Sequence, residues 1–159
     1  MQEIDIIDRK IVDLLIEDGR MPCSEIARRI GNITERAVRY RLNRLLETEV
    51  IQVCAVANPR AVGYPVVADV WLQVDSDSIQ EVARKMKDYQ CVSYVAYSIG
   101  EMDVSVQVIA KDTNEVYEFV TEVIGKTPGV RKTTTSIVPH VLKDVYQWHI
   151  PASACTEQE

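Results

Sequence analysis

The sequence has no apolar run that approaches the roughly 20 residues needed to cross a bilayer. Its charged start, MQEIDIIDRK, also lacks the basic segment followed by an apolar segment that makes up a secretion signal. These absences argue against a membrane-spanning or secreted protein. With 47% hydrophobic residues in 159, the chain has enough apolar side chains to bury one core or two small ones. We therefore expect a soluble globular protein of the cytoplasm, with no membrane partner.

Cysteine and histidine are too sparse and too widely spaced to suggest a metal site. The four cysteines contain no C-x-x-C pair, which argues against both a zinc knuckle and a disulfide framework. The two histidines, His140 and His149, are nine residues apart, which is not a usual metal-ligand step, and no serine or cysteine nucleophile elbow accompanies them. We therefore expect no metal, no cofactor and no catalytic site.

Positive charge is scarce overall but concentrated in one place. The net charge is −6, with nine basic and ten acidic residues in 1–58 and nine against fourteen in 59–159. Within residues 28–44, however, six arginines face a single acid, Glu35. An acidic total argues against a surface that binds nucleic acid everywhere, whereas a confined arginine cluster can still form a binding face.

Three helices are predicted before the first convincing strand. Apolar residues at helical spacing predict helices over about residues 5–17 and 22–30, the second with proline in its first turn and glycine after its end. The third begins near Asn32 or Thr34. Both residues can act as the N-cap, and Asn32 would form a capping-box-like pair with Glu35. The sequence leaves the choice between them open.

The third helix has the profile of a DNA-reading helix. At about 100° per residue, its apolar residues point together toward the other helices. The outward side carries the arginines, a phenol and an amide, with Arg36, Tyr40, Asn43 and Arg44 facing outward and Arg39 and Arg41 on the flanks. Such groups bind phosphates and base edges in a major groove. Alone, the pattern would be explained by a solvated helix face, but three short helices with a tight turn favour DNA binding.

From residue 66 the hydrophobic period changes to two, and the rest of the chain predicts a β-α-β-β-α-β order. The segments CVSYVAYSI and MDVSVQVIA predict a hairpin, and VRKTTTSIVP a final β-branched strand. This order is typical of a ferredoxin-like sandwich with both helices on one sheet face. The other face would be left to pack on a partner, so self-association is expected.

The predicted fold class is α+β, in four parts. Residues 1–49 form a helix-turn-helix domain, 50–64 a strand-like connector, and 65–150 the ferredoxin-like domain. Residues 151–159, PASACTEQE in sequence, show no periodicity and are expected to be a flexible tail.

Several segments together resemble the leucine-responsive/asparagine-regulator (Lrp/AsnC) family of transcriptional regulators over about residues 4–146. They are IDIIDRKIVDLLIEDGR, SEIARRIG, AVRYRLNRL, VIQVCAVANPRAVG and the turn GEMD, all in the family's order. The resemblance implies a winged or strand-flanked helix-turn-helix joined to a ferredoxin-like domain. That domain would make homodimers and higher oligomers, tetramers or octamers, and bind a small-molecule effector, usually an amino acid.

The resemblance also assigns residues to two sites. The segment from Thr34 to Arg44 matches the family's recognition helix, although GNITERAV has one residue more than the family's usual turn. The implied contacts to double-stranded operator DNA are Thr34, Glu35, Arg36, Arg39, Tyr40, Arg41, Asn43 and Arg44. Gly100 and Asp103 match the family's G-x-x-D turn at the ligand cleft between subunits. The implied effector-binding residues are Ser98, Gly100, Met102, Asp103, Thr134 and Ser136.

The chemistry of these residue types agrees with an amino-acid ligand. Glycine lets the backbone approach a ligand closely, and the carboxylate of Asp103 can pair with an ammonium group. Thr134 and Ser136 share one face of the last strand and could donate to a ligand carboxylate. Without the resemblance, a tight hairpin in which Asp103 caps the turn would explain the same residues.

Two other functions are consistent with parts of the sequence. VGYPVVADVW is similar to the first sheet strand of siroheme-decarboxylase-type enzymes, tetrapyrrole-acting relatives of the family. The arginine- and histidine-rich substrate segment expected of them is absent from CVSYVAYSIGEMD. A stand-alone ligand-sensing oligomer without DNA binding is the third possibility. We predict a sequence-specific DNA-binding transcriptional regulator.

Overall fold

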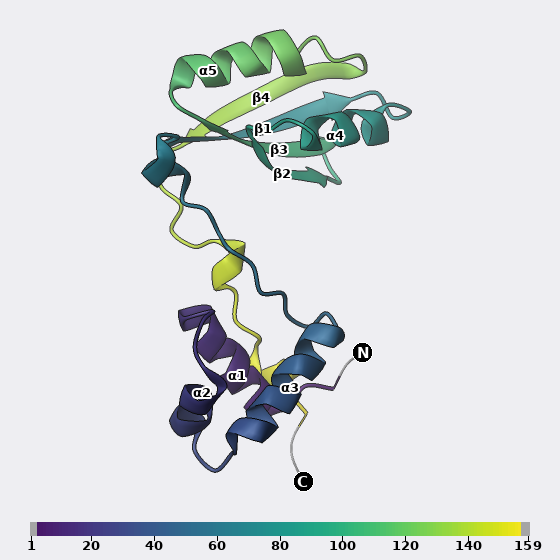
Figure 1. The fold of residues 1–159 in the computed structure, drawn as a ribbon. Coiled ribbons are helices and arrows are strands. Elements are labelled where there is room, and N and C mark those ends of the chain that lie inside the picture. The colour runs from purple at the N-terminus through teal and green to yellow at the C-terminus, as the bar shows by residue number, and fades with distance from the viewer. Residues whose placement is uncertain (1–2, 157–159) are drawn as a thin grey trace. The chain divides into compact units, whose positions relative to one another are not determined.

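The computed structural model describes residues 3–156, and the chain forms two compact units. The first unit combines the residues up to Val56 with the residues from Leu142 onward. The second unit is Ala57–Val141, so the chain passes from one unit to the other twice (Figure 1). No helix of the described residues has the length and apolarity to span a bilayer.

Three helices form the first unit: α1 (Ile6–Glu17), α2 (Cys23–Ile30) and α3 (Glu35–Glu47). The side chain of Asp5 caps α1 by accepting the backbone N–H groups of Ile7 and Asp8 at 2.9 and 2.8 Å. Asp8 completes a capping box by accepting from the backbone N–H of Asp5 at 3.2 Å. These reciprocal bonds satisfy donors that the first turn of a helix otherwise leaves unpaired.

The start of α3 resolves the choice that the sequence left open. Thr34 is the N-cap, and its hydroxyl oxygen accepts the backbone N–H of Ala37 at 3.2 Å. Asn32 instead lies in the turn between α2 and α3, with φ 55°, directly after Gly31 with φ 71°. Asparagine and glycine tolerate this left-handed region better than other residues, which explains the pair at this turn.

The core of the first unit draws on both ends of the chain. Its buried members are Ile11, Val12, Leu14, Ile26, Ala27, Val38, Leu45 and Ile150. Seven come from the three helices, as the apolar spacing predicts. The eighth, Ile150, comes from the C-terminal segment, which the sequence assigned to other parts of the molecule.

The C-terminal segment differs from the prediction of a ferredoxin-like domain to residue 150 followed by a flexible tail. Residues Ala152–Ala154 form a 3-10 turn, and the backbone N–H of Thr156 donates to the carbonyl oxygen of Ile4 at 2.8 Å. A single buried isoleucine, Ile150, and a few polar bonds hold this stretch. Contacts of this kind give the sequence no hydrophobic periodicity. The part of the predicted tail in residues 157–159 lies outside the described residues.

The connector also differs from its predicted strand-like form. Residues 51–58 belong to no strand in the described part of the chain, and Pro59–Val62 form a 3-10 helix. The asparagine before that helix, Asn58, caps it by accepting from the backbone N–H of Arg60 at 3.1 Å. The β-branched residues of the connector have no neighbouring strand here, and a strand needs one to form its ladder.

The second unit has the predicted β-α-β-β-α-β order. Its elements are β1 (Val66–Val74), α4 (Ile79–Lys87), β2 (Val92–Tyr97), β3 (Val104–Ala110), α5 (Thr113–Glu118) with a π-helical continuation (Phe119–Ile124), and β4 (Val130–Val138). The sheet order is β2-β3-β1-β4, and all neighbouring strands are antiparallel. The ferredoxin-like topology is thus confirmed.

Alternation along the central strands separates the two faces of this sheet. Every second residue of β1, from Ala68 to Val74, is buried against α4 and α5 together with the matching residues of β3. The opposite face carries Trp71, which lies in register between Ser105 of β3 and Thr134 of β4. Neither helix of this unit covers that face.

Candidate nucleic-acid interface

Helix α3 is fixed to the first unit by one side and leaves the other side in solvent. Val38 and Leu45 are fully buried in the core of the unit. On the opposite side Arg36, Tyr40 and Asn43 are exposed, and Tyr40 keeps 71% of its surface. Residues three and four apart lie side by side on a helix, so these three side chains form one continuous outward stripe.

The two arginines of the outward side differ in their partners. Arg36 makes no ion pair with any residue that the structure describes. Arg39 pairs with Glu35 at 2.6 Å, and both side chains are well exposed. Exposed pairs of this kind contribute only about 0 to 1 kcal/mol, so a phosphate can replace Glu35 as the partner of Arg39.

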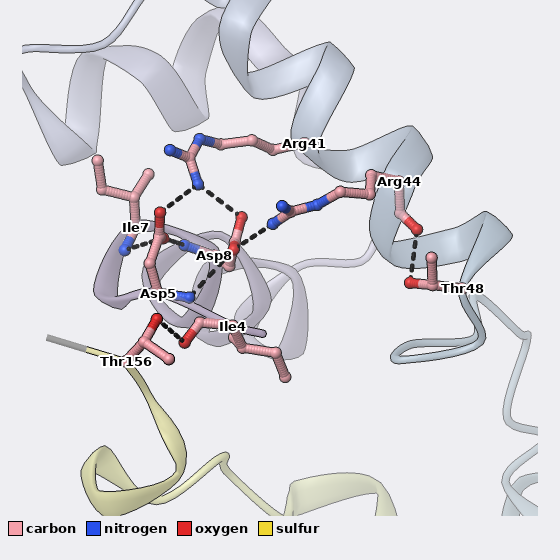
Figure 2. Close-up of polar contacts among 8 residues, drawn as sticks. All are labelled: Ile4, Asp5, Ile7, Asp8, Arg41, Arg44, Thr48 and Thr156. Atoms are coloured by element: carbon pink, nitrogen blue, oxygen red, sulfur yellow. Dashed lines mark hydrogen bonds and ion pairs between the residues drawn. The ribbon is translucent and has the colours of Figure 1, made fainter. Parts of the chain in front are cut away.

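Arg41 and Arg44 do not belong to this stripe: both guanidiniums contact acidic side chains at the start of α1 (Figure 2). One guanidinium nitrogen of Arg41, Nη1, lies 2.7 Å from Asp5 Oδ2 and 2.9 Å from Asp8 Oδ1. Arg44 donates to the other oxygen of Asp8, a carboxylate that is only 1% exposed. The prediction placed Arg44 on the outward side and Arg41 on a flank, and the structure holds both against an acidic pair.

Asp5 and Asp8 explain why Arg41 and Arg44 lie against α1 and not where the sequence placed them. Partial burial would lower the pKa of Arg41, but the hydrogen bonds that Arg41 donates to Asp5 and Asp8, together with the negative charge of both acids, outweigh it and raise that pKa above its ordinary value. Asp5 and Asp8, three residues apart before an apolar helix, have the spacing of a capping box. That spacing could have identified the cap, but it could not have shown which arginines reach it.

The arginines of α2 also have acidic partners. Arg28 donates two hydrogen bonds to Glu25, at 2.8 and 2.6 Å, and the bond from Arg28 lowers the pKa of Glu25. Arg29 donates to Glu17 of α1 at 2.7 Å. Of the six arginines in residues 28–44, only Arg36 has no acidic partner in the described chain. The charge available for a ligand is therefore smaller than the count of arginines suggests.

The predicted effector turn lies between β2 and β3, and Asp103 fastens it to the end of β1. The backbone N–H of Asp103 donates to Leu72 at 2.8 Å, and its side-chain Oδ2 accepts the N–H of Val74 at 2.7 Å. Its backbone carbonyl accepts from Ser98 at 2.8 Å. The sequence offered an Asp103 that caps the hairpin turn as the alternative to ligand binding. In the structure the side chain of Asp103 instead ties the turn to the neighbouring strand β1.

The same carboxylate keeps some capacity for a ligand. The side chain of Asp103 is 27% exposed, and its second oxygen, Oδ1, makes no hydrogen bond within the described chain. Arg131 lies 4.0 Å from Oδ2. Gly100 has φ 142°, and a Cβ added there would meet nothing within 4 Å, so the turn is open on that side.

The six predicted effector residues fall into two groups within one chain. Ser98, Gly100, Met102 and Asp103 lie together at the turn. Thr134 and Ser136 lie on β4, in register with Trp71 and Asp69 of β1. In the sheet, strand β1 lies between β3, which follows the turn, and β4, which carries Thr134 and Ser136.

Comparisons with known proteins identify both units. Residues 4–46 match the model of the AsnC-type helix-turn-helix domain, and residues 67–148 match that of the Lrp/AsnC ligand binding domain. An HTH-type transcriptional regulator of Pyrococcus horikoshii is 39% identical over 142 residues, 89% of each chain. The HTH-type transcriptional regulator FL11 of Pyrococcus furiosus is 34% identical, over 89% of this chain and 93% of the relative.

Solved structures share the fold. Escherichia coli AsnC superposes with a TM-score of 0.82 at 18% identity, over 91% of this chain and 99% of that one. A transcriptional regulator of Neisseria meningitidis, solved as an L-Met complex, gives 0.82 at 24% identity, over 89% and 93%.

Proposed function

The chain belongs to the Lrp/AsnC family of transcriptional regulators, and we propose that it reads operator DNA through the outward stripe of α3. One observation carries this assignment: the stripe presents Arg36 without an acidic partner in the described chain, next to an exposed phenol and amide. A guanidinium matches phosphate or the edge of guanine, and an amide matches the edge of adenine. A DNA-binding protein of this type acts in the cytoplasm of a prokaryotic cell.

The residues of α3 would have different roles in DNA binding, according to the side of the helix on which they lie. Arg36, Tyr40 and Asn43 point outward and would contact bases or phosphates. Arg39 would leave Glu35 and pair with a phosphate, so Glu35 would compete with the DNA phosphate for the guanidinium of Arg39. The hydroxyl of Thr34 is occupied as the N-cap, so its role would be to place the first turn of α3. Arg41 and Arg44 are committed to α1 and would not contact DNA directly.

The test begins with selection of bound fragments from the source genome, followed by affinity measurements on the selected operator. Arg36→Gln should weaken operator binding, because it removes the one guanidinium of the stripe with no competing acid in the described chain. Arg20→Gln is the matched control, since Arg20 belongs to the same unit, is 96% exposed and lies outside α3. Equal effects of the two substitutions would rule out α3 as the DNA reader.

The second unit would sense a small molecule, and an amino acid is the ligand we propose. Asp103 Oδ1 could accept the ligand ammonium while Oδ2 continues to hold Val74. Backbone groups beside Gly100 could bind the ligand carboxylate. The L-Met bound to the Neisseria relative supports a ligand of this class, although the two chains share only 24% identity. Thr134 and Ser136 would contribute from a neighbouring subunit, because β1 separates them from the turn of their own chain.

Substitution at Asp103 can separate its two roles. Asp103→Asn keeps an oxygen acceptor for Val74 but removes the charge that binds an ammonium, whereas Asp103→Ala removes both. A thermal-shift screen of the twenty amino acids on the wild type would find the ligand. Asp103→Asn should then weaken its binding about ten- to a hundredfold, as expected for the loss of a charge-assisted hydrogen bond.

Asp75→Asn, at an exposed residue, serves as the control when ligand affinity is measured on the variants. A ligand that binds Asp103→Asn as tightly as the wild type lies elsewhere on the protein. If no amino acid binds the wild type, the sensing proposal fails and the DNA-binding proposal stands.

Association would use the sheet face that α4 and α5 leave uncovered. Trp71 and its strand neighbours would bury this face against a second copy, giving a homodimer that assembles further. Trp71→Lys should lower the mass measured by sedimentation at micromolar concentration. Tyr117→Lys, on the exposed side of α5, should leave the mass unchanged. A wild-type monomer under these conditions would contradict the proposal.

A further inference from the structure

The C-terminal strap, residues 149–156, lies beyond both family matches, which end at residues 46 and 148. It nevertheless packs with the helices of the first unit. Ile150 is only 7% exposed and belongs to the same buried cluster as Ile11, Ile26 and Val38. Burying such a side chain contributes about 1.5 to 3 kcal/mol, so the strap is part of the folded unit.

Polar bonds hold the strap on either side of Ile150. His149 Nδ1 lies 2.7 Å from Asp13 Oδ1, in the middle of α1. The backbone N–H of Thr156 donates to the carbonyl of Ile4 at 2.8 Å, and the Thr156 hydroxyl donates to the same carbonyl at 3.3 Å. Residues Ala152–Ala154 make the turn between them. The strap therefore follows α1 back to the residue that precedes its cap.

The strap and the recognition helix α3 each contact residues at the start of α1 (Figure 2). Ile4, which accepts from Thr156, immediately precedes Asp5, the N-cap of α1. Asp5 and Asp8 of that capping box hold Arg41, and Asp8 also holds Arg44. The bond from Thr156 is therefore one residue away from the capping box that holds two arginines of α3.

We infer that the strap is a positioning element for DNA reading: by fixing Ile4 and the capping box of α1, it sets the orientation of α3. The inference rests on the proposal that α3 reads operator DNA. Specific contacts require side chains held to within about 0.5 Å of their binding geometry. Loss of the strap should therefore weaken operator binding more than binding to random DNA, which depends chiefly on charge.

The bond from Thr156 can be removed by a matched pair of substitutions. Thr156→Pro removes the backbone N–H, whereas Thr156→Ala keeps it and loses only the hydroxyl. Cys155, with φ −90° and ψ 139°, already has the extended conformation that a residue before proline adopts. We expect Thr156→Pro to weaken operator binding about tenfold and Thr156→Ala less than twofold.

Truncation tests the whole strap. A chain that ends at Trp148 should lose operator binding at least as strongly as Thr156→Pro, whereas a chain that ends at Thr156 should keep it. Each variant is measured well below its melting temperature, with the folded fraction determined by circular dichroism and binding to random DNA measured in parallel. A lower melting temperature with unchanged operator affinity of the folded protein would overturn the inference, because the strap would then only stabilise the unit.

A second readout does not depend on DNA. The side-chain NMR signals of Arg41 and Arg44 in the unbound protein should shift in Thr156→Pro and stay in place in Thr156→Ala. Unchanged signals in both variants would overturn the inference. If the wild type shows no operator preference at all, the proposed function fails, and the NMR comparison still decides whether the strap positions α3.

Discussion

The two sides of α3 use the same residue type for opposite purposes. On the outward side, Arg36 has no acidic partner in the described chain, and Arg39 has only the exposed Glu35. On the side toward α1, Arg41 and Arg44 share the buried carboxylate of Asp8. The positions are separated by less than three turns of one helix. A count of arginines on a helix thus overstates its capacity for DNA, because some of that charge stabilises the fold.

The difference follows from the cost of burying an acid. A carboxylate removed from water is tolerated only when charges and hydrogen-bond donors around it compensate for the lost hydration. Asp8 receives such compensation from Arg41, Arg44 and the backbone N–H of Asp5. The arginines toward α1 are thus required by Asp8, whereas the outward arginines are available for a ligand.

The largest effect is expected at the acid itself. Asp8→Asn leaves Arg44 facing a neutral amide and leaves Arg41 with Asp5 as its one carboxylate partner. We expect the free energy of unfolding of the first unit to fall by about 3 kcal/mol. Urea unfolding followed by circular dichroism measures the change. Glu17→Gln removes an exposed partner of Arg29 and should cost less than about 0.5 kcal/mol. Similar losses in the two variants would remove the distinction between the buried and exposed pairs.

The next largest effect concerns the outward side. With Arg36 and Arg39 on phosphates in each subunit of a dimer, four counterions are released, and log K should fall with log[salt] at a slope near −3.6. Counting Arg41 or Arg44 as a third contact in each subunit would give six counterions and a slope near −5.4. Arg36→Gln should reduce the slope to about −1.8 and weaken operator binding by about 2 kcal/mol, with the free energy of unfolding unchanged. Salt titrations of both proteins would test this, and a slope unaffected by Arg36→Gln would contradict it.

A smaller effect is expected for Arg44. Arg44→Gln removes one of the two arginines on Asp8 and should lower the free energy of unfolding by about 1 to 1.5 kcal/mol. The slope of log K against log[salt] should remain that of the wild type, since the guanidinium of Arg44 is held by Asp8. Urea unfolding and salt titration of the same variant decide the point. A smaller salt dependence of operator binding in Arg44→Gln would show that Arg44 contacts DNA.

The smallest effect is expected for Tyr40. Tyr40→Phe keeps the ring and removes only the hydroxyl, so operator binding should weaken by about 0.5 to 1 kcal/mol. Binding to random DNA and the free energy of unfolding should not change, because Tyr40 is exposed. Competition between selected and random fragments measures the preference. An equal loss on both would show that Tyr40 contacts the backbone and not a base.

Periodicity was sufficient for the three helices of the first unit and for the helices and strands of the second, because helix and strand spacing are local properties. It was misleading for the connector, whose β-branched residues belong to no strand in the described chain. It was insufficient for Arg44, whose projected position is outward but whose long side chain reaches the acid of another helix. Ile150 illustrates the same limit, since a single apolar residue near a chain end produces no period. Asp103 was open to two interpretations because one carboxylate oxygen fastens the turn and the other has no partner in the described chain.

The discontinuous first unit has a consequence for the order in which the protein becomes active during synthesis. Domains generally fold as units while the chain emerges, with the N-terminal one first. Here the helices of the DNA-binding unit are made first, but Ile150, their last core residue, is made after the whole second unit. A nascent chain that has not completed its second unit therefore lacks the last core residue of its DNA reader.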